Sequence, residues 1–195
     1  MGSVMNRLAS EIIGRGVIVR QETVLIGRIQ EIVINPEDGR LAGLIIKEGF
    51  GKEKLKAVAE KDMLGLNEKF VLISSYSALG DLDEIVRIKN ILDLGIKIKN
   101  CKVQTLGGVV LGKTVDYSVD FKLGKLSRLY VNPKNWRRLT KQHIIDSKCI
   151  VRIEKDKIIV DDTCLKVKKK AAISTATASK ELSLNAKVQT HIGLH

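Results

Sequence analysis

The stretch GRIQEIVINPEDGRLAGLII, residues 27–46, contains two aliphatic runs joined by the turn Asp38-Gly39. Isoleucine and valine favour the pleated, half-buried surface of a strand. A glycine at the tip can take the positive φ that hairpin turns require. Gly27 opens the first run directly after an apolar pair, where a glycine indicates a sharp bend or a close backbone approach. The stretch therefore predicts a strand, a turn and a second strand.

The same pattern returns 85 residues later, in GKTVDYSVDFKLGKLSRLYV, residues 112–131. The two stretches align without a gap and share four identical pairs: Gly27/Gly112, Gly39/Gly124, Leu41/Leu126 and Leu44/Leu129. Four identities in twenty positions can arise by chance, so the shared glycine spacing and hydrophobic pattern carry the argument. We predict two tandem copies of one small all-β unit.

Short β-branched runs bounded by turn residues extend both copies, as small barrels require. These runs are residues 17–20, 70–73, 96–98, 103–104, 149–153 and 158–160. Residues 5–13 and 81–94 have helix-compatible spacing, and residues 62–65 and 142–145 are predicted as short helical turns. We predict a first barrel at 8–76, a connector at 77–91, a second barrel at 92–165 and a flexible basic tail at 166–195.

The positive charge is unevenly distributed along the 195 residues, whose formal net charge is +12. Residues 1–80 hold 11 Lys and Arg against 10 Asp and Glu, residues 81–165 hold 17 against 11, and residues 166–195 hold 6 against 1. The basic excess thus belongs to the second unit and the tail. It indicates a polyanionic partner, either RNA or an acidic membrane surface. The alternative is a charge excess that only keeps the protein soluble.

The last thirty residues differ in composition from the rest of the chain. Residues 166–170 contain four lysines, and residues 171–179 are almost wholly Ala, Ser and Thr. Such a composition cannot support a packed core, so we expect a mobile tail in free solution. A short amphipathic helix at residues 180–188 is the alternative when a partner is bound.

The cysteines and the absence of targeting signals bear on the compartment. Cys101, Cys149 and Cys164 are an odd number without C-x-x-C spacing, which argues against a disulfide framework and for three thiols in a reducing compartment. We find no signal-peptide pattern and no apolar run long enough to span a bilayer. These features predict a cytoplasmic protein.

The order of these segments resembles the PRC-barrel family, named for the photosynthetic reaction-centre H subunit and including a domain of the ribosome maturation factors. The resemblance rests on GRGVIV (14–19), LIGRIQEIVINPEDGRLAGLII (25–46) and VAEKDMLGLNEKFVLIS (58–74), with a looser match at VLGKTVDYSVDFKLGKLSRLYV (110–131). It implies compact, strongly bent β-barrels with a non-enzymatic role in docking proteins or RNA. The chain lacks the paired tyrosines of the ribosome maturation factors, since its tyrosines are Tyr76, Tyr117 and Tyr130.

We identify no catalytic constellation in the sequence, and we predict neither an enzyme, a metal site nor a cofactor. His191 and His195 have the i, i+4 spacing of two helical metal ligands, but no acid or thiol is near them in the sequence. His143 has no cysteine partner that the sequence makes evident. The glycine-bearing loops at residues 49–51 and 106–108 lack the Lys-Ser/Thr or helix start of a phosphate cradle.

The strongest candidate for a binding site is a basic segment that contains the only tryptophan. The candidate residues for binding a partner or a polyanion are Lys134, Trp136, Arg137, Arg138, Lys141, Lys168, Lys169 and Lys170. Cations neutralise phosphates, and an exposed indole stacks on a base, enters an anionic membrane interface or anchors a protein contact. The alternative is that Trp136 closes the second barrel as a core residue.

These observations predict a non-enzymatic adaptor or scaffold that docks a protein partner through its second barrel and tail. One alternative is a ribosome- or RNA-associated assembly factor. Another is a peripheral scaffold at an anionic membrane surface. The sequence alone predicts no oligomeric state.

Overall fold

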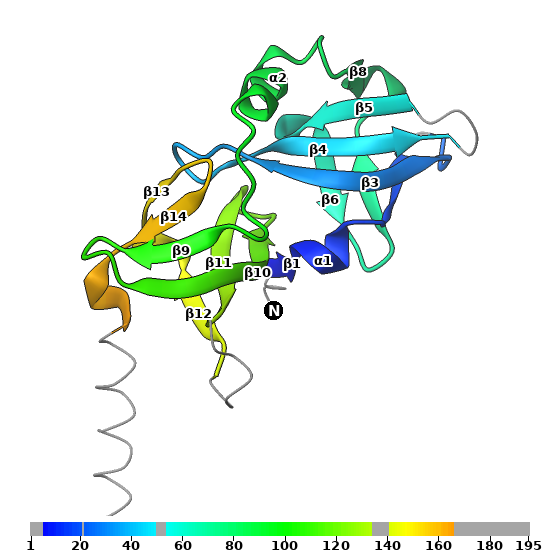
Figure 1. Ribbon diagram of the computed structural model, residues 1–195. Helices are drawn as coiled ribbons and strands as arrows, with labels where there is room; N and C mark the ends of the chain where they lie inside the picture. The colour runs from blue at the N-terminus through cyan, green and yellow to red at the C-terminus, as the bar shows by residue number, and fades with distance from the viewer. Residues whose placement is uncertain (1–5, 21, 50–53, 134–140, 166–195) are drawn as a thin grey trace, which may run out of the picture. The chain divides into compact units, whose positions relative to one another are not determined.

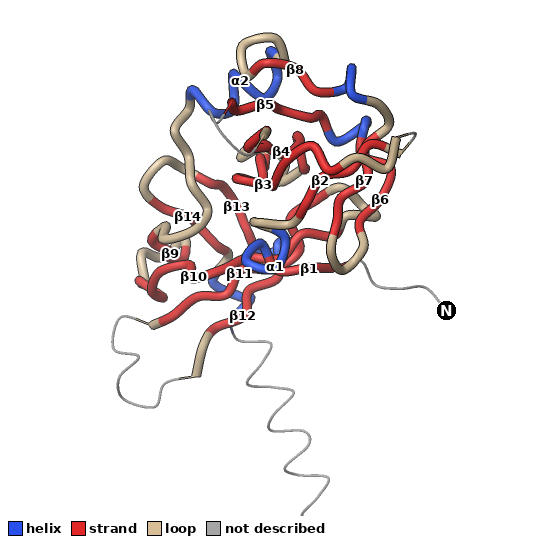
Figure 2. Tube along the Cα trace, turned by 90° about the vertical axis from the view of Figure 1, so that its right-hand side faces the viewer, coloured by secondary structure: helices blue, strands red, loops and turns tan. Residues whose placement is uncertain are grey.

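The computed structural model describes residues 6–20, 22–49, 54–133 and 141–165 (Figure 1). By contacts, the chain divides into a main body, residues 1–160, and a terminal segment, residues 161–195. The main body contains all the described strands (Figure 2), so the prediction of a mostly β protein is confirmed. The described residues of the terminal segment include a 3-10 helix, η4 (Asp162–Leu165). The predicted tail at 166–195 lies outside the described residues.

The first of two sheets has the strand order β6-β7-β2-β3-β4-β5-β8. Its strands are β2 (Gly16–Val19), β3 (Leu25–Ile34), β4 (Leu41–Glu48), β5 (Lys54–Ala59), β6 (Met63–Leu66), β7 (Phe70–Ile73) and β8 (Leu79–Asp81). Neighbouring strands are antiparallel except for β2 and β7, which are parallel. Two 3-10 helices, η1 (Glu60–Asp62) and η2 (Tyr76–Ala78), precede β6 and β8.

The second sheet has the order β12-β11-β10-β9-β14-β13, and β1 also pairs with β10. Its strands are β1 (Asn6–Leu8), β9 (Lys102–Thr105), β10 (Val110–Asp120), β11 (Lys125–Asn132), β12 (His143–Asp146), β13 (Ile150–Ile153) and β14 (Lys157–Val160). Here the parallel pair is β9 and β14, and η3 (Ser147–Cys149) precedes β13. The first six strands of the first sheet thus have counterparts with the same pairing in the second.

The irregularities of the two sheets match as well as their strand order. Each pairing of β3 with β4 and of β10 with β11 contains two register shifts, and the shifts lie 85 residues apart. They fall between Ile29/Glu31 and Val33/Ile34 in the first sheet and between Thr114/Asp116 and Ser118/Val119 in the second. Because bulges bend a strand and increase its twist, both long strands bend at corresponding places.

Two corresponding glycines lie where the backbone approaches a neighbouring strand. A Cβ atom on Gly27 would collide with the carbonyl oxygen of Lys47, and one on Gly112 would collide with that of Asn132. Gly112 also has a φ of +143°, which L side chains rarely adopt. Glycine is therefore required at both positions by close packing of the backbone.

The two long hairpins pair with each other at their tips. Gly39 and Gly124 have φ values of +68° and +59°, the left-handed conformation that a hairpin tip requires. The N–H of Leu41 donates to the carbonyl of Gly124 at 2.9 Å, and the N–H of Leu126 donates to that of Gly39 at 2.8 Å. The exchange is reciprocal, as in a contact between two copies related by a twofold axis.

The two sheets bury aliphatic side chains at corresponding positions. Val17, Leu44 and Ile73 in the first sheet are fully buried, as are Val103, Leu129 and Val160 in the second. Within the described residues, no backbone pairing joins the end strands of either sheet, so neither sheet is closed by hydrogen bonds.

The first sheet carries a helix, α2 (Val86–Asp93), on one face. Ile88 of this helix is fully buried in a cluster that also contains Val33, Ala42, Ile45 and Ala57. The helix lies inside the predicted helical range of 81–94 and is shorter, because β8 continues to the start of that range.

Several local predictions were wrong. In the range 5–13, predicted as helical, the described residues begin with the strand β1 and continue with the one-turn helix α1 (Ala9–Ile12), because Asn6 to Leu8 pair with β10. Residues 62–65 and 142–145, predicted as helical turns, are mostly strands β6 and β12, and the 3-10 turns precede β6 and follow β12. Residues 96–98 are not a strand. The spacing of apolar residues within a segment does not reveal a strand that pairs with it from a distant part of the chain.

Candidate docking face

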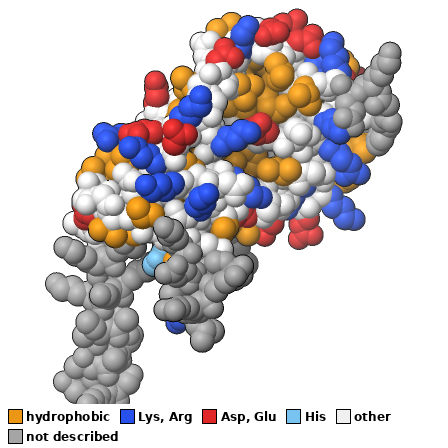
Figure 3. Space-filling view, viewed as in Figure 1, with side chains coloured by type: hydrophobic (Ala, Val, Ile, Leu, Met, Phe, Trp, Pro, Cys, Tyr) orange, Lys and Arg blue, Asp and Glu red, His pale blue; other side chains and the backbone are white. Residues whose placement is uncertain are grey.

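A row of three lysines crosses the second sheet. Lys113 of β10 pairs with Lys102 of β9, and Lys102 pairs with Lys157 of β14. Residues paired across neighbouring strands have their side chains on the same face, with Cβ atoms about 5 Å apart. Figure 3 shows Lys and Arg side chains over the region of β9 and β14, at the left of the molecule, with Asp and Glu side chains beside some of them.

The row holds more positive charge than its neighbours neutralise. The Lys157 ammonium lies 3.4 Å from a carboxylate oxygen of Glu154, whose other oxygen lies 2.6 Å from the Arg152 guanidinium. Lys102 and Lys113 are exposed and form no ion pair with any described carboxylate. Like charges placed directly opposite each other destabilise a sheet. The arrangement therefore costs folding free energy unless an anion covers it.

The corresponding row of the first sheet has a different chemistry. Gly16 pairs with Arg28 on one side and with Phe70 on the other. The Phe70 ring and the Leu25 side chain lie directly beside Gly16, where they would collide with a Cβ atom. The Arg28 guanidinium donates to the carbonyl of Gly14 at 3.0 Å. This row thus has apolar side chains at one end and, at the other, an arginine that donates a hydrogen bond to the backbone. The lysine row is therefore particular to the second sheet.

Most of the predicted binding site lies outside the described residues. Lys141 is described and exposed, whereas Lys134, Trp136, Arg137, Arg138 and Lys168, Lys169 and Lys170 lie outside the described residues. The lysines of the row were missed by the sequence reading. Lys157 is far from Lys102 and Lys113 in the chain, and only the strand register places the three side by side.

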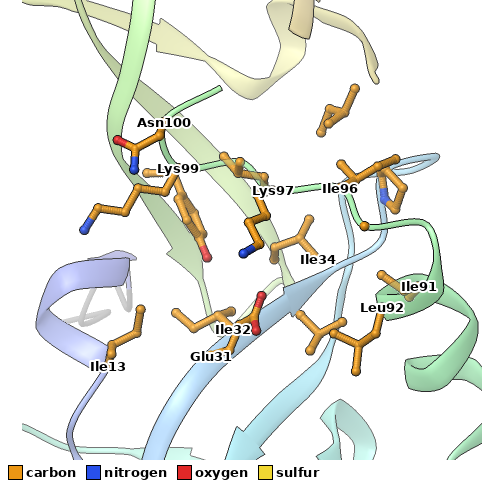
Figure 4. Close-up of a pocket in the computed structure, with 16 residues that line it drawn as sticks. Ile13, Glu31, Ile32, Ile34, Ile91, Leu92, Ile96, Lys97, Lys99 and Asn100 are labelled. Atoms are coloured by element: carbon orange, nitrogen blue, oxygen red, sulfur yellow. The ribbon is translucent and has the colours of Figure 1, made fainter. Parts of the chain in front are cut away.

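A cavity of about 370 Å³ lies beside α2 and the segment of residues 95–100 that follows it (Figure 4). Ile32 and Ile34 come from β3, and Ile91 and Leu92 come from α2. The lining is mainly aliphatic. Its charged members include Glu31 and Lys97, whose side chains point toward one another in Figure 4.

Tyr117 also lines this cavity, and it is almost completely buried. Burial, followed by the nearby carboxylates of Glu31 and Asp116, raises the pKa of the Tyr117 phenol far above its ordinary value. The phenol therefore stays protonated and neutral throughout the physiological range. Among the described residues there is no group of three or more His, Cys, Asp or Glu that could hold a metal ion.

The cysteines differ from the expectation of three thiols. Cys149 is disulfide-bonded, which corrects that expectation for this residue. Cys101 is a free and buried thiol, and burial raises its pKa. A buried thiol that stays protonated is a poor nucleophile, so Cys101 acts as a small apolar residue of the core.

The fold defines a mostly β protein built from short, bent and largely antiparallel strands. Residues 5–92 match the model of the PRC-barrel domain family. The resemblance seen in the sequence is confirmed for this first part. A search of the curated proteins found no match to the chain. No described helix has the length and apolar character needed to cross a membrane.

Proposed function

We propose that the chain is a non-enzymatic docking protein made of two PRC-type units, in which the second unit presents a cationic face to an anionic partner. Four features support a second unit: the shared strand order, the matching register shifts, the corresponding glycines and the buried positions in common. Sheets that diverge in sequence yet keep bulges at the same places are typical of related units.

The observation that carries the docking role is the lysine row of Lys102, Lys113 and Lys157. A like-charge row opposes folding, and the first unit has apolar or satisfied residues at the same places. Residues that lower the stability of the free protein have a physical reason to be there when they bind a partner. When an anion binds across the row, the electrostatic contribution of the three lysines changes from destabilising to stabilising.

The proposal is tested by retention on immobilised heparin, which serves as a general polyanion probe. We expect the wild-type protein to be retained and to elute with salt, because each neutralised anionic group releases counterions. The double variant Lys102→Ala/Lys113→Ala is expected to elute at a clearly lower salt concentration. The matched control is Lys61→Ala/Lys69→Ala, which removes two exposed lysines from the first unit and is expected to elute close to the wild type.

Two results would contradict the proposal. One is a wild-type protein that passes through the column at low salt. The other is equal elution of the two double variants, which would show that only total charge matters. Circular dichroism and thermal unfolding of each variant establish that the sheets are intact.

A further inference from the structure

The tip of the β9–β10 hairpin exposes aliphatic side chains. Leu106, Val109 and Val110 are 54%, 61% and 47% exposed. Large aliphatic residues exposed side by side on one loop are uncommon on the surface of a soluble domain, and such patches mark contact sites. The tip lies at the end of the same two strands that supply Lys102 and Lys113.

The backbone of this tip is held in place. The N–H of Thr105 donates to the carbonyl of Val109 at 2.9 Å, and the N–H of Gly108 donates to that of Thr105 at 3.0 Å. Gly108 has a φ of +83°, which permits the tight turn. The N–H of Leu106 donates to the carbonyl of Val160 in β14 at 2.9 Å. The apolar side chains are thus presented on a fixed loop, and their binding costs little ordering entropy.

The lysine row lies a short way behind the tip. Lys113 follows Val110 by three positions in β10, a distance of about 10 Å along an extended strand. A surface-bound segment buries its apolar side chains about 5–10 Å below the headgroups of a bilayer. At that depth, the ammonium groups of Lys102 and Lys113 reach the level of the lipid phosphates, where basic residues are attracted to an anionic leaflet.

The corresponding tip of the first unit lacks this combination. Between β2 and β3, Arg20, Glu22 and Thr23 are polar and exposed, and Val24 is the large aliphatic residue exposed there among the described positions. The apolar tip and two lysines of the row, Lys102 and Lys113, therefore lie on one hairpin of the second sheet. Two independent changes at one end of one hairpin indicate a single partner that requires both.

The chemistry of the tip decides which anionic partner is favoured. A nucleic acid offers bases that stack on aromatic rings, whereas Leu106, Val109 and Val110 are aliphatic. An aliphatic tip with a basic collar matches the interface of a bilayer, where an apolar layer lies directly beneath anionic headgroups.

We propose that the β9–β10 hairpin docks the chain on an anionic membrane surface. Leu106, Val109 and Val110 enter the interfacial region, and Lys102 and Lys113 contact lipid phosphates. This inference rests on the proposed docking function and names its partner.

The test is flotation of the full chain with vesicles of phosphatidylcholine containing roughly 30% phosphatidylserine, compared with pure phosphatidylcholine. We expect the wild-type protein to float with the anionic vesicles and much less with the neutral ones. Leu106→Ser/Val109→Ser is expected to reduce binding to the anionic vesicles about tenfold or more, because it removes the inserted apolar surface. Its retention on heparin is expected to stay unchanged.

The matched control is Val24→Ser, at the tip of the first unit, which is expected to float like the wild type. Lys102→Ala/Lys113→Ala is expected to float much less than the wild type and to elute from heparin at a lower salt concentration. Retention on heparin without flotation, or binding to single-stranded RNA in place of the vesicles, would overturn the membrane inference and leave the docking function standing. Flotation of Leu106→Ser/Val109→Ser equal to that of wild type would also overturn it. Failure of both assays for the wild type would remove both proposals.

Discussion

The two sheets of this protein share a backbone plan and differ in what they place on it. Strand order, bulges and close-packed glycines recur, as described above. The first sheet adds β8 to the edge of β5 and packs α2 on one face. The second adds a lysine row and an apolar hairpin tip. Positions that set the course of the backbone are constrained, whereas positions that face outward are free to acquire a partner.

One pair of corresponding residues shows this divergence inside the fold. Val33 of β3 belongs to the apolar cluster under α2. Its counterpart in β10 is Ser118, which pairs with Leu8 of β1 and is buried, with no hydrogen-bond partner for its hydroxyl among the described residues. The position under α2 in the first sheet thus carries an aliphatic side chain, whereas its counterpart beside β1 in the second sheet carries a small polar one.

The largest expected effect is at Ile88, the residue that joins α2 to the first sheet. Ile88→Ala leaves a cavity among fully buried neighbours and is expected to lower the free energy of unfolding by about 2–5 kcal/mol. Urea denaturation measures the change. Val86→Ala, on the exposed side of the same helix at 64% exposure, is the control and is expected to change stability by less than about 0.5 kcal/mol. Equal effects of the two substitutions would mean that α2 does not stabilise the sheet by packing.

The corresponding glycines provide a second test, since both sheets require them for the same reason. Gly27→Ala and Gly112→Ala each force a strand away from a backbone carbonyl, and each is expected to cost about 1–3 kcal/mol of stability. Gly112→Ala is expected to cost more, because its φ of +143° adds backbone strain. Thermal unfolding measures both.

Gly65→Ala is the control for the two glycine variants, since nothing lies within 4 Å of an added Cβ atom at that position. It is expected to leave the melting temperature nearly unchanged. If Gly27→Ala and Gly112→Ala also leave the melting temperature nearly unchanged, the close backbone approach at these two glycines is contradicted.

A smaller effect is expected at the contact between the hairpin tips, where Arg40 pairs with Lys125. Two like charges lie opposite each other there, so Lys125→Glu is expected to raise stability by about 0.2–1 kcal/mol at low ionic strength. The gain is expected to shrink at high salt, because exposed charges are screened. Lys122→Glu changes the same charge nearby and is the control. A loss of stability in Lys125→Glu at low salt would contradict the pairing of the tips.

The smallest effect concerns β8, which the second sheet lacks among its described strands. The Asp81 carboxylate lies 3.1 Å from the Lys56 ammonium and 3.2 Å from that of Lys54. Its hydrogen bonds to Lys56 and then Lys54 lower the pKa of Asp81, and Asp81 raises the pKa of Lys56. A carboxyl with a lowered folded pKa stabilises above its unfolded pKa, and this contribution is lost as pH falls through the folded value.

We therefore expect Asp81→Asn to lower the melting temperature slightly at neutral pH and to match the wild type at strongly acidic pH, well below the ordinary Asp pKa of about 3.9. Differential scanning calorimetry across this range measures the gap. A gap that persists at acidic pH would assign the effect to lost hydrogen-bond geometry rather than to charge.

The sequence was most informative where glycine and aliphatic spacing dictate the backbone. The hairpin at residues 27–46 and its repeat at 112–131 were predicted because turn glycines and β-branched runs act locally. The lysine row could not be predicted, since it depends on the register of the β9–β10 hairpin and on the pairing of β9 with β14, which is far away in the chain. The strand β5 was overlooked because Lys54 and Lys56 interrupt its apolar pattern. The disulfide at Cys149 is likewise a property of distance in space.

The reciprocal contact of the hairpin tips has a consequence for how the chain folds. The contact joins residues 39 and 124, which are 85 positions apart, so the segment between them must be ordered before the tips can pair. Formation of this non-local contact is therefore expected to be slow. Because the two tips are alike, the first tip of one molecule can pair with the second tip of another during refolding. Exchange of that kind makes domain-swapped oligomers. Refolding yield should therefore fall as protein concentration rises, and the pairing of the two tips within one chain should form best at high dilution.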